Sequence, residues 1–156
     1  KSSFFDSSKG NQLIVARVKE EEFEDLNSWK YYNGEQFVEN IEEVKGLLNN
    51  VSCELSVNEE DGKYLRVFTH NVQSPYIATS STPYGPFDEM RIAYVCPEKL
   101  CDHMYIYNAK AHPHLSKEGE LLVSYNINTS NFSENIQYGR TYGPRFIKLR
   151  KESEAK

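Results

Sequence analysis

Two side chains that can take part in acid–base or ligand chemistry, Glu54 and His112, lie in extended segments of the sequence. Glu54 is flanked by Cys53 and Leu55, and poorly hydrated surroundings of this kind favour the neutral, proton-donating form of a carboxyl group. Glu54 is therefore our candidate acid, with a solvated carboxylate on an outer surface as the alternative. His112 precedes the rigid Pro113, where a hydrogen-bonded core histidine is the plain alternative to a functional imidazole.

These two residues fall at similar places in a repeated pattern. Residues 51–68 and 109–125 each contain two strand-like runs joined by a turn, with Gly62 in the first turn and Gly119 in the second. Runs of this kind predict β-hairpins. Aligning the two glycines gives a spacing of 57 residues and places the two candidate side chains within one residue of each other. A strand-and-turn repeat of this size is typical of a radially repeated sheet, so the sequence predicts an all-β chain made of β-propeller blades.

The strand signals divide the chain into parts of the predicted propeller. A half blade spans about 12–34, a blade about 51–96 and a last blade about 104–150, whose inner strand we expect at about 109–114. Residues 35–49 predict a short helix or an irregular connection. The half blade lacks its inner strands and the last blade lacks one strand, and open sheet edges favour aggregation. We therefore expect an upstream N-terminal segment of the same precursor, present as a second chain, to complete the ring, with Cys53 as the candidate for a link to it.

The amino-acid composition limits the kinds of partner that we expect the chain to bind. The 156 residues carry a net charge of -5, with scattered Lys and Arg, which argues against binding to a nucleic acid backbone. Aromatic residues make up 13% of the chain, a content that suits both pleated surfaces and sugar recognition. No apolar run approaches the roughly 20 residues that cross a bilayer, so we expect no membrane span.

Three N-x-Ser/Thr sequences predict N-glycosylation in loops or at strand edges. Their acceptors are Asn50, Asn128 and Asn131. Such sites favour a protein that is secreted, lysosomal or displayed at the cell surface.

The cysteines agree with an oxidising compartment. Cys96 and Cys101 are close enough in sequence to close a short turn as a disulfide. Reduced, packed cysteines in a cytosolic protein are the alternative. A metal site with His103 is discounted, because no second ligand pair stands at zinc-site spacing.

Several motifs resemble a known group of proteins. The combination of AKAHPHL, LLVSYNIN and PRFIKLR with ELSV, DGKYLRVFT and S-x-x-x-Y-G-P-F resembles the C-terminal end of five-bladed β-propeller proteins of the glycoside hydrolase, arabinanase-like type, including uncharacterised families of that group. The resemblance runs from about residue 13 to 150. It implies that this chain supplies about the last two and a half blades, around a funnel on the propeller axis.

The resemblance also implies roles for particular residues. Glycoside hydrolysis uses two carboxylates, of which Glu54 is the candidate in this chain, and the second carboxylate is expected on the upstream blades. By position, His112 resembles a last-blade histidine that contacts a central ion, calcium or another, or its waters. Lys110, Asn126 and Arg145 are candidates to line the funnel, Arg145 being suited to a sugar carboxylate.

Two aromatic side chains, Tyr84 and Trp29, offer faces for sugar stacking, although core packing is the alternative for each. Two classes of function follow. The first is a carbohydrate-active propeller, glycoside hydrolase-like, that acts on extracellular or lysosomal glycans. The second is a non-catalytic propeller for glycan binding or cell-surface interaction, and fold alone does not decide between the two.

Overall fold

The structure is a computed structural model that describes residues 10–70, 74–97, 103–139 and 142–150. Strands dominate, and they form three antiparallel sheets of three or four strands each, which confirms the all-β prediction. The chain divides into two compact units, residues 1–51 and 52–156. No helix in the described ranges is long and apolar enough to span a membrane.

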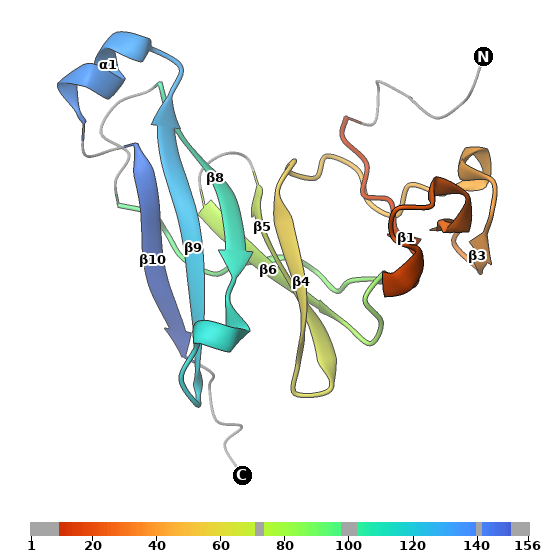
Figure 1. Cartoon of the computed structure of the whole chain (residues 1–156). Helices are drawn as coiled ribbons and strands as arrows, with labels where there is room; N and C mark the ends of the chain where they lie inside the picture. The colour runs from red at the N-terminus through yellow and green to blue at the C-terminus, as the bar shows by residue number, and fades with distance from the viewer. Residues whose placement is uncertain (1–9, 71–73, 98–102, 140–141, 151–156) are drawn as a thin grey trace. The chain divides into compact units, whose positions relative to one another are not determined.

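The first unit contains one small sheet (Figure 1). Strands β1 (Ala16–Arg17), β2 (Lys30–Tyr32) and β3 (Phe37–Val38) pair in that order. Three 3₁₀ turns, Glu20–Glu22, Leu26–Ser28 and Ile41–Glu43, lie between and after the strands. Strand β3 and the turn after it lie in the segment for which a short helix or an irregular connection was predicted.

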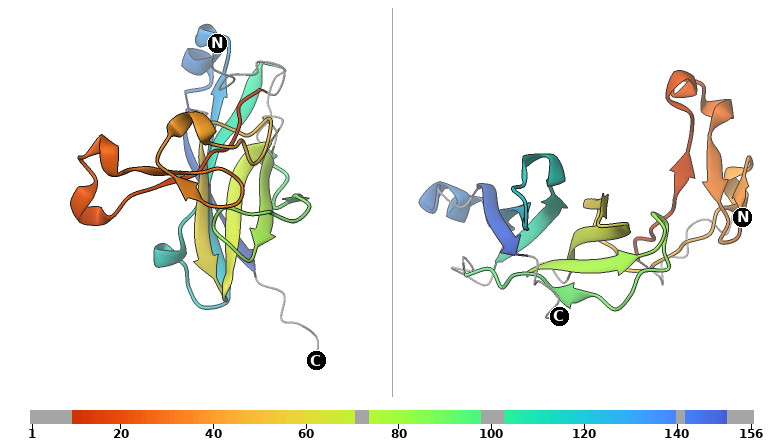
Figure 2. Two further views of the ribbon diagram at one scale, coloured as in Figure 1. Left: turned by 90° about the vertical axis from the view of Figure 1, so that its right-hand side faces the viewer. Right: turned by 90° about the horizontal axis from the view of Figure 1, so that it is seen from below.

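The second unit contains two sheets, which both figures show beside each other (Figure 2). The first sheet runs β4 (Leu55–Glu60), β5 (Lys63–His70), β6 (Ser74–Ser80) and β7 (Arg91–Ile92) in chain order. The second sheet joins β8 (Met104–Ala111), β9 (Glu120–Thr129) and β10 (Gly143–Arg150), again in chain order. A short helix, α1 (Phe132–Gln137), connects β9 to β10.

Both predicted hairpins are present. Asp61 and Gly62 join β4 to β5, with φ of 52° and 75° respectively, the left-handed conformation that short hairpin turns require. In the second hairpin, the expected strand at 109–114 is corrected to Met104–Ala111. Residues 113–115 form a 3₁₀ turn instead, because Pro113 has no backbone N–H to give to a sheet and suits the first turn of a helix.

The core of the second unit follows from the period-two alternation of strands. Along β9 every second side chain is buried, and Tyr125 and Ile127 are each 1% exposed. These side chains pack with the apolar residues of β8 and with Val67 of β5. One face of the β8–β10 sheet is therefore the core face.

Strand β8 stands at the edge of its sheet, and its backbone finds acceptors on the neighbouring sheet. A bulge between Tyr107 and Lys110 interrupts the pairing with β9. There the Ala109 N–H donates to Thr69 Oγ1 at 3.2 Å, and the Ala111 N–H donates to Ser56 Oγ at 2.9 Å. Two hydroxyl groups thus satisfy buried donors that the bulge and the sheet edge would leave unpaired.

We predict that Thr69→Val destabilises the protein by about 1–3 kcal/mol, although valine matches threonine in size, because the buried Ala109 N–H loses its acceptor. Thr69 is 4% exposed, so water cannot replace the hydroxyl without rearrangement. Urea unfolding of the variant measures the change. Unaltered or increased stability would contradict this role of the hydroxyl.

Candidate functional site

The side of the β8–β10 sheet that faces away from the core carries the candidate site. Because paired residues of antiparallel strands share a face, the pairs Tyr107–Asn126, Lys110–Ser124 and Ser124–Phe146 place these side chains together. We call this surface the polar face. It consists of Tyr105, Tyr107, Lys110, Leu122, Ser124, Asn126, Phe146 and Lys148.

Tyr107 lies at the centre of the polar face. Its side chain hydrogen-bonds with that of Asn126, and its ring centroid lies 5.6 Å from that of Tyr105. Burial, the largest influence, raises the pKa of the Tyr107 phenol, and Tyr142 and Tyr105 raise it further. The nearby carboxylate of Glu54 also raises this pKa, whereas the hydrogen bond with Asn126 lowers it. The phenol is neutral near pH 7, as the ordinary tyrosine pKa of about 10 dictates, and can donate a hydrogen bond; its raised pKa extends this state to more alkaline pH.

Glu54 reaches the polar face from the other sheet. It is half-buried and directly precedes β4, and its backbone carbonyl accepts a hydrogen bond of 2.7 Å from Ser52 Oγ. Glu54 precedes Leu55, which pairs with Phe68, and the next residue, Thr69, accepts a hydrogen bond from Ala109 of β8, so Glu54 lies at the edge of its sheet that faces β8. A carboxylate, a neutral phenol and an amide thus gather from three strand segments.

The structure corrects the alignment of the two hairpins that was based on their turn glycines. The pairing of Leu55 with Phe68, extended by one residue, sets Glu54 opposite Thr69, whereas Asn126, the residue 57 positions after Thr69, pairs with Tyr107. Tyr107, and not His112, is therefore the structural counterpart of Glu54. The difference arises because residues 112–119 form a longer connection than the Asp61–Gly62 turn, and because β8 contains a bulge.

His112 lies just beyond β8, on the same side as the polar face. Its Nε2 lies 2.7 Å from Ser124 Oγ, and its ring centroid lies 6.1 Å from that of His114. Its backbone N–H donates to the Leu122 carbonyl at 2.8 Å. These contacts fix the imidazole at one end of the surface that also holds Lys110 and Asn126.

The described residues do not fit a metal centre around His112. Calcium takes six to eight oxygen ligands, and in the described ranges no three His, Cys, Asp or Glu side chains gather as a possible metal site. The hydroxyl of Ser124 and a second imidazole are the neighbours of His112. The central ion remains a prediction.

Two other predicted site residues lie elsewhere. Arg145 pairs with the core residue Tyr125, so its side chain leaves β10 on the face opposite to the polar face. Tyr84 follows β6 near the Asp61–Gly62 turn, because Tyr64 pairs with both Glu59 and Ser80. Glu54 precedes β4 at the other end of this sheet. Lys110, Asn126 and His112 therefore lie on one surface, and Glu54 acts electrostatically on Tyr107 of that surface, whereas Arg145 and Tyr84 lie elsewhere.

The residues predicted for modification can be placed in part. Asn50 and Asn131 are exposed, and the Asn131 side chain caps α1 by accepting from the Ser133 N–H at 3.2 Å. Asn128 is half-buried and its Oδ1 accepts from Asn135 Nδ2 at 2.9 Å. Cys96 is buried, but Cys101 lies outside the described residues, so the disulfide stays a prediction.

Tyr107 is the residue of this surface that sequence reasoning missed. In YIYNAK, the alternation of Tyr105 and Tyr107 was a usable signal for two aromatic side chains on one face of a strand. The left-handed φ of 58° at Asn108, which accompanies the bulge, has no such signal.

Known proteins share features with this all-β chain of consecutive antiparallel sheets. The chain belongs to the family described as "Domain of unknown function (DUF5005)", whose model matches residues 6–151. None of the curated proteins compared with it matches significantly.

A solved structure has a similar fold. It is the crystal structure of a protein from Bacteroides ovatus ATCC 8483 described as a "putative hydrolase", with a TM-score of 0.66 and 24% sequence identity. The similarity covers 88% of this chain and 39% of that protein's chain. Our chain thus corresponds to well under half of that structure.

We predict that Tyr107 makes stability sensitive to alkaline pH. Below about pH 10, the ordinary pKa of tyrosine, the phenol is neutral in both states and its contribution is fully present. Because the pKa is raised in the folded protein, the unfolded chain loses this proton first as pH increases, and stability falls.

Tyr107→Phe should therefore flatten the fall of the unfolding free energy above about pH 10, as measured by urea unfolding across that range. An identical slope in wild type and Tyr107→Phe would refute the assignment.

Proposed function

We propose that this chain forms the C-terminal part of a five-bladed β-propeller that hydrolyses glycans, and that the polar face with Glu54 is its share of the active site. The observation that carries the proposal is the convergence of Glu54, Tyr107 and Asn126 from two different sheets. A carboxylic acid beside neutral hydrogen-bonding and aromatic groups is a combination that suits sugars.

The propeller arrangement has support from topology. Each sheet is an antiparallel meander in chain order, as in a propeller blade. Strands β4 and β8, the first of consecutive sheets, contact each other through Ser56 and Ala111, as inner strands of adjacent blades would. The similar fold of a larger protein described as a "putative hydrolase" supports the hydrolase part of the proposal.

The chemistry assigns a role to each residue. Glu54 acts as the proton donor to the glycosidic oxygen, and a second carboxylate, supplied by another part of the protein, acts as base or nucleophile. Tyr107 and Asn126 donate hydrogen bonds to sugar hydroxyl groups. Lys110 and His112, along the same surface, bind neighbouring sugar units.

The alternative, a non-catalytic glycan-binding propeller, also rests on a specific observation. Glu54 is the one carboxylate among the described groups that influence Tyr107. A site with one carboxylate binds sugars without cleaving them, unless a second acid joins it.

Glu54→Gln should lower glycan hydrolysis by the native protein about 10²–10⁴-fold, because it removes the proton donor, while glycan binding persists. Turnover on a panel of oligosaccharides and binding to a glycan array measure the two effects. Glu59→Gln is the matched control, since Glu59 is an exposed residue of β4, the strand that Glu54 directly precedes. Binding without turnover in the wild-type protein would favour the non-catalytic alternative.

Cell location and processing belong to the same proposal. We propose N-glycans at Asn50, Asn128 and Asn131, a disulfide between Cys96 and Cys101, and a secreted, lysosomal or cell-surface location. Glycans are the substrates or ligands found in those compartments.

We also propose that an N-terminal segment of the same precursor, as a second chain, completes the ring. Residues 1–156 expressed alone should then aggregate or unfold without a sharp transition, because β10, at the outer edge of its sheet, is left as an open edge strand. Light scattering and thermal unfolding test this. A monomer with one cooperative transition would show that no other segment is needed.

A further inference from the structure

A buried cation, Arg66, lies on the face of the β4–β7 sheet that points away from β8. It is 5% exposed, and its guanidinium group stacks between two aromatic rings. The Cζ atom lies 4.3 Å from the ring centroid of Phe68 and 4.7 Å from that of Phe87. Cation–π contacts of this kind stabilise a desolvated guanidinium group in part.

The hydrogen-bonding capacity of Arg66 is not met. Its Nε and Nη1 atoms are buried without a hydrogen-bond acceptor. Burial lowers the pKa of the guanidinium group, and the charge of Asp88 opposes that effect. A buried cation with incomplete pairing is costly, and additional negative charge nearby lowers that cost.

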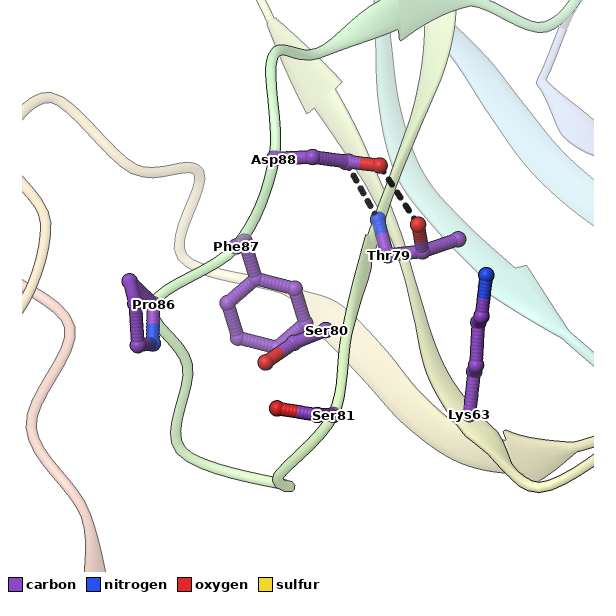
Figure 3. A pocket seen from close by; sticks show the side chains of 7 residues that line it. All are labelled: Lys63, Thr79, Ser80, Ser81, Pro86, Phe87 and Asp88. Atoms are coloured by element: carbon purple, nitrogen blue, oxygen red, sulfur yellow. Dashed lines mark hydrogen bonds between the residues drawn. The ribbon is translucent and has the colours of Figure 1, made fainter.

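The carboxylate of Asp88 is already engaged with β6. It accepts hydrogen bonds from the Thr79 N–H, at 2.6 Å, and from the Thr79 hydroxyl group (Figure 3). Desolvation raises the pKa of Asp88, but these hydrogen bonds, together with Arg91 and Lys63, lower it overall. Asp88 is thus ionised and held in place, and it offsets one of the positive charges around it.

Beside these groups lies a hollow of about 370 Å³, within the size range of small-ligand sites. Its lining combines a ring, hydroxyl groups and charges from Lys63, Thr79, Ser80, Ser81, Pro86, Phe87 and Asp88, as Figure 3 shows. Phe87 both lines the hollow and packs on Arg66, so the hollow adjoins the buried cation.

The loop that forms one wall is held in a fixed conformation. Asp88 N–H donates to the Thr79 carbonyl at 2.8 Å, and Thr82 N–H donates to Ser80 Oγ at 3.2 Å. Gly85 has a φ of 91°, and a Cβ atom there would lie 3.0 Å from the Phe87 nitrogen. The hollow is therefore formed before any ligand arrives, which lowers the entropic cost of binding.

We propose that this hollow is a second carbohydrate site, which binds the carboxylate-bearing ring of a uronic acid unit. Lys63, Arg66 and Arg91 all interact with the charge of Asp88, and Glu60 pairs with Lys63 across the strands. Three positive charges thus stand against two negative ones, so the site favours an anion. The serine hydroxyls bond to sugar hydroxyls, and Phe87 offers an apolar contact. Glu54 precedes β4, whereas Lys63 follows the turn at its other end, so this site is separate from the proposed active site.

The test uses glucuronate and glucose as probes, with binding to the whole protein followed by isothermal titration calorimetry. Glucuronate should bind more tightly than glucose, and added salt should weaken it. Lys63→Gln should weaken glucuronate binding about threefold to fivefold, the effect of one exposed charge pair, and leave glucose binding unchanged. Lys117→Gln, at an exposed lysine of the connection between β8 and β9, is the matched control and should have no effect.

Phe87→Ala should weaken both sugars, and circular dichroism shows whether this variant folds. Lys63 is exposed, so its variant keeps the proposal testable if Phe87→Ala does not fold. Equal binding of glucuronate and glucose, no binding of glucuronate, or equal effects of the two lysine variants would overturn the proposal. Loss of hydrolysis in Glu54→Gln with intact glucuronate binding would show that the two sites are independent.

Discussion

The second unit depends on the hydrogen bonds that join the edge strand β8 of one sheet to hydroxyl groups of the other sheet. Strand β8 is an edge strand with a bulge, so the N–H groups of Ala109, at the bulge, and of Ala111, at the open edge, point away from β9. Thr69 and Ser56 accept these hydrogen bonds from the neighbouring sheet. Buried backbone donors need acceptors, so the two hydroxyl groups set which part of β4 and β5 lies against β8. This alignment brings Glu54 beside Tyr107.

The same alignment leaves one face of the β8–β10 sheet for core packing and the other for the candidate site. With the core face of the β8–β10 sheet packed against Val67, the other face is left for polar and aromatic groups. There burial, with a smaller contribution from the charge of Glu54, raises the pKa of the Tyr107 phenol. On the β4–β7 sheet, the buried Arg66 marks a second region with a charge that its surroundings compensate incompletely. Each of the two proposed sugar sites thus lies beside a side chain whose titration is affected by burial, Tyr107 in one and Arg66 in the other.

Much of the fold could be predicted from sequence, because local signals determine hairpins. The Asp61–Gly62 turn predicted the hairpin of β4 and β5, whereas β8 begins at Met104 and not at the predicted residue 109. Strand β3 has two residues, too few for a period to be seen. The site was harder to predict than the fold. Asn108 gives no sequence signal for the bulge, and the turn glycines alone aligned Glu54 with His112 instead of Tyr107. The position of Arg145 depends on the register of β10, which sequence does not specify.

The central claim is that Glu54, Tyr107 and Asn126 contact one sugar ring. A crystal structure of the whole protein soaked with short oligosaccharides tests it most directly. We predict a sugar unit on the polar face, with one hydroxyl or glycosidic oxygen within hydrogen-bonding distance of the Glu54 carboxyl group and another near Asn126. A sugar bound solely at other surfaces, with the polar face covered by protein, would contradict the account.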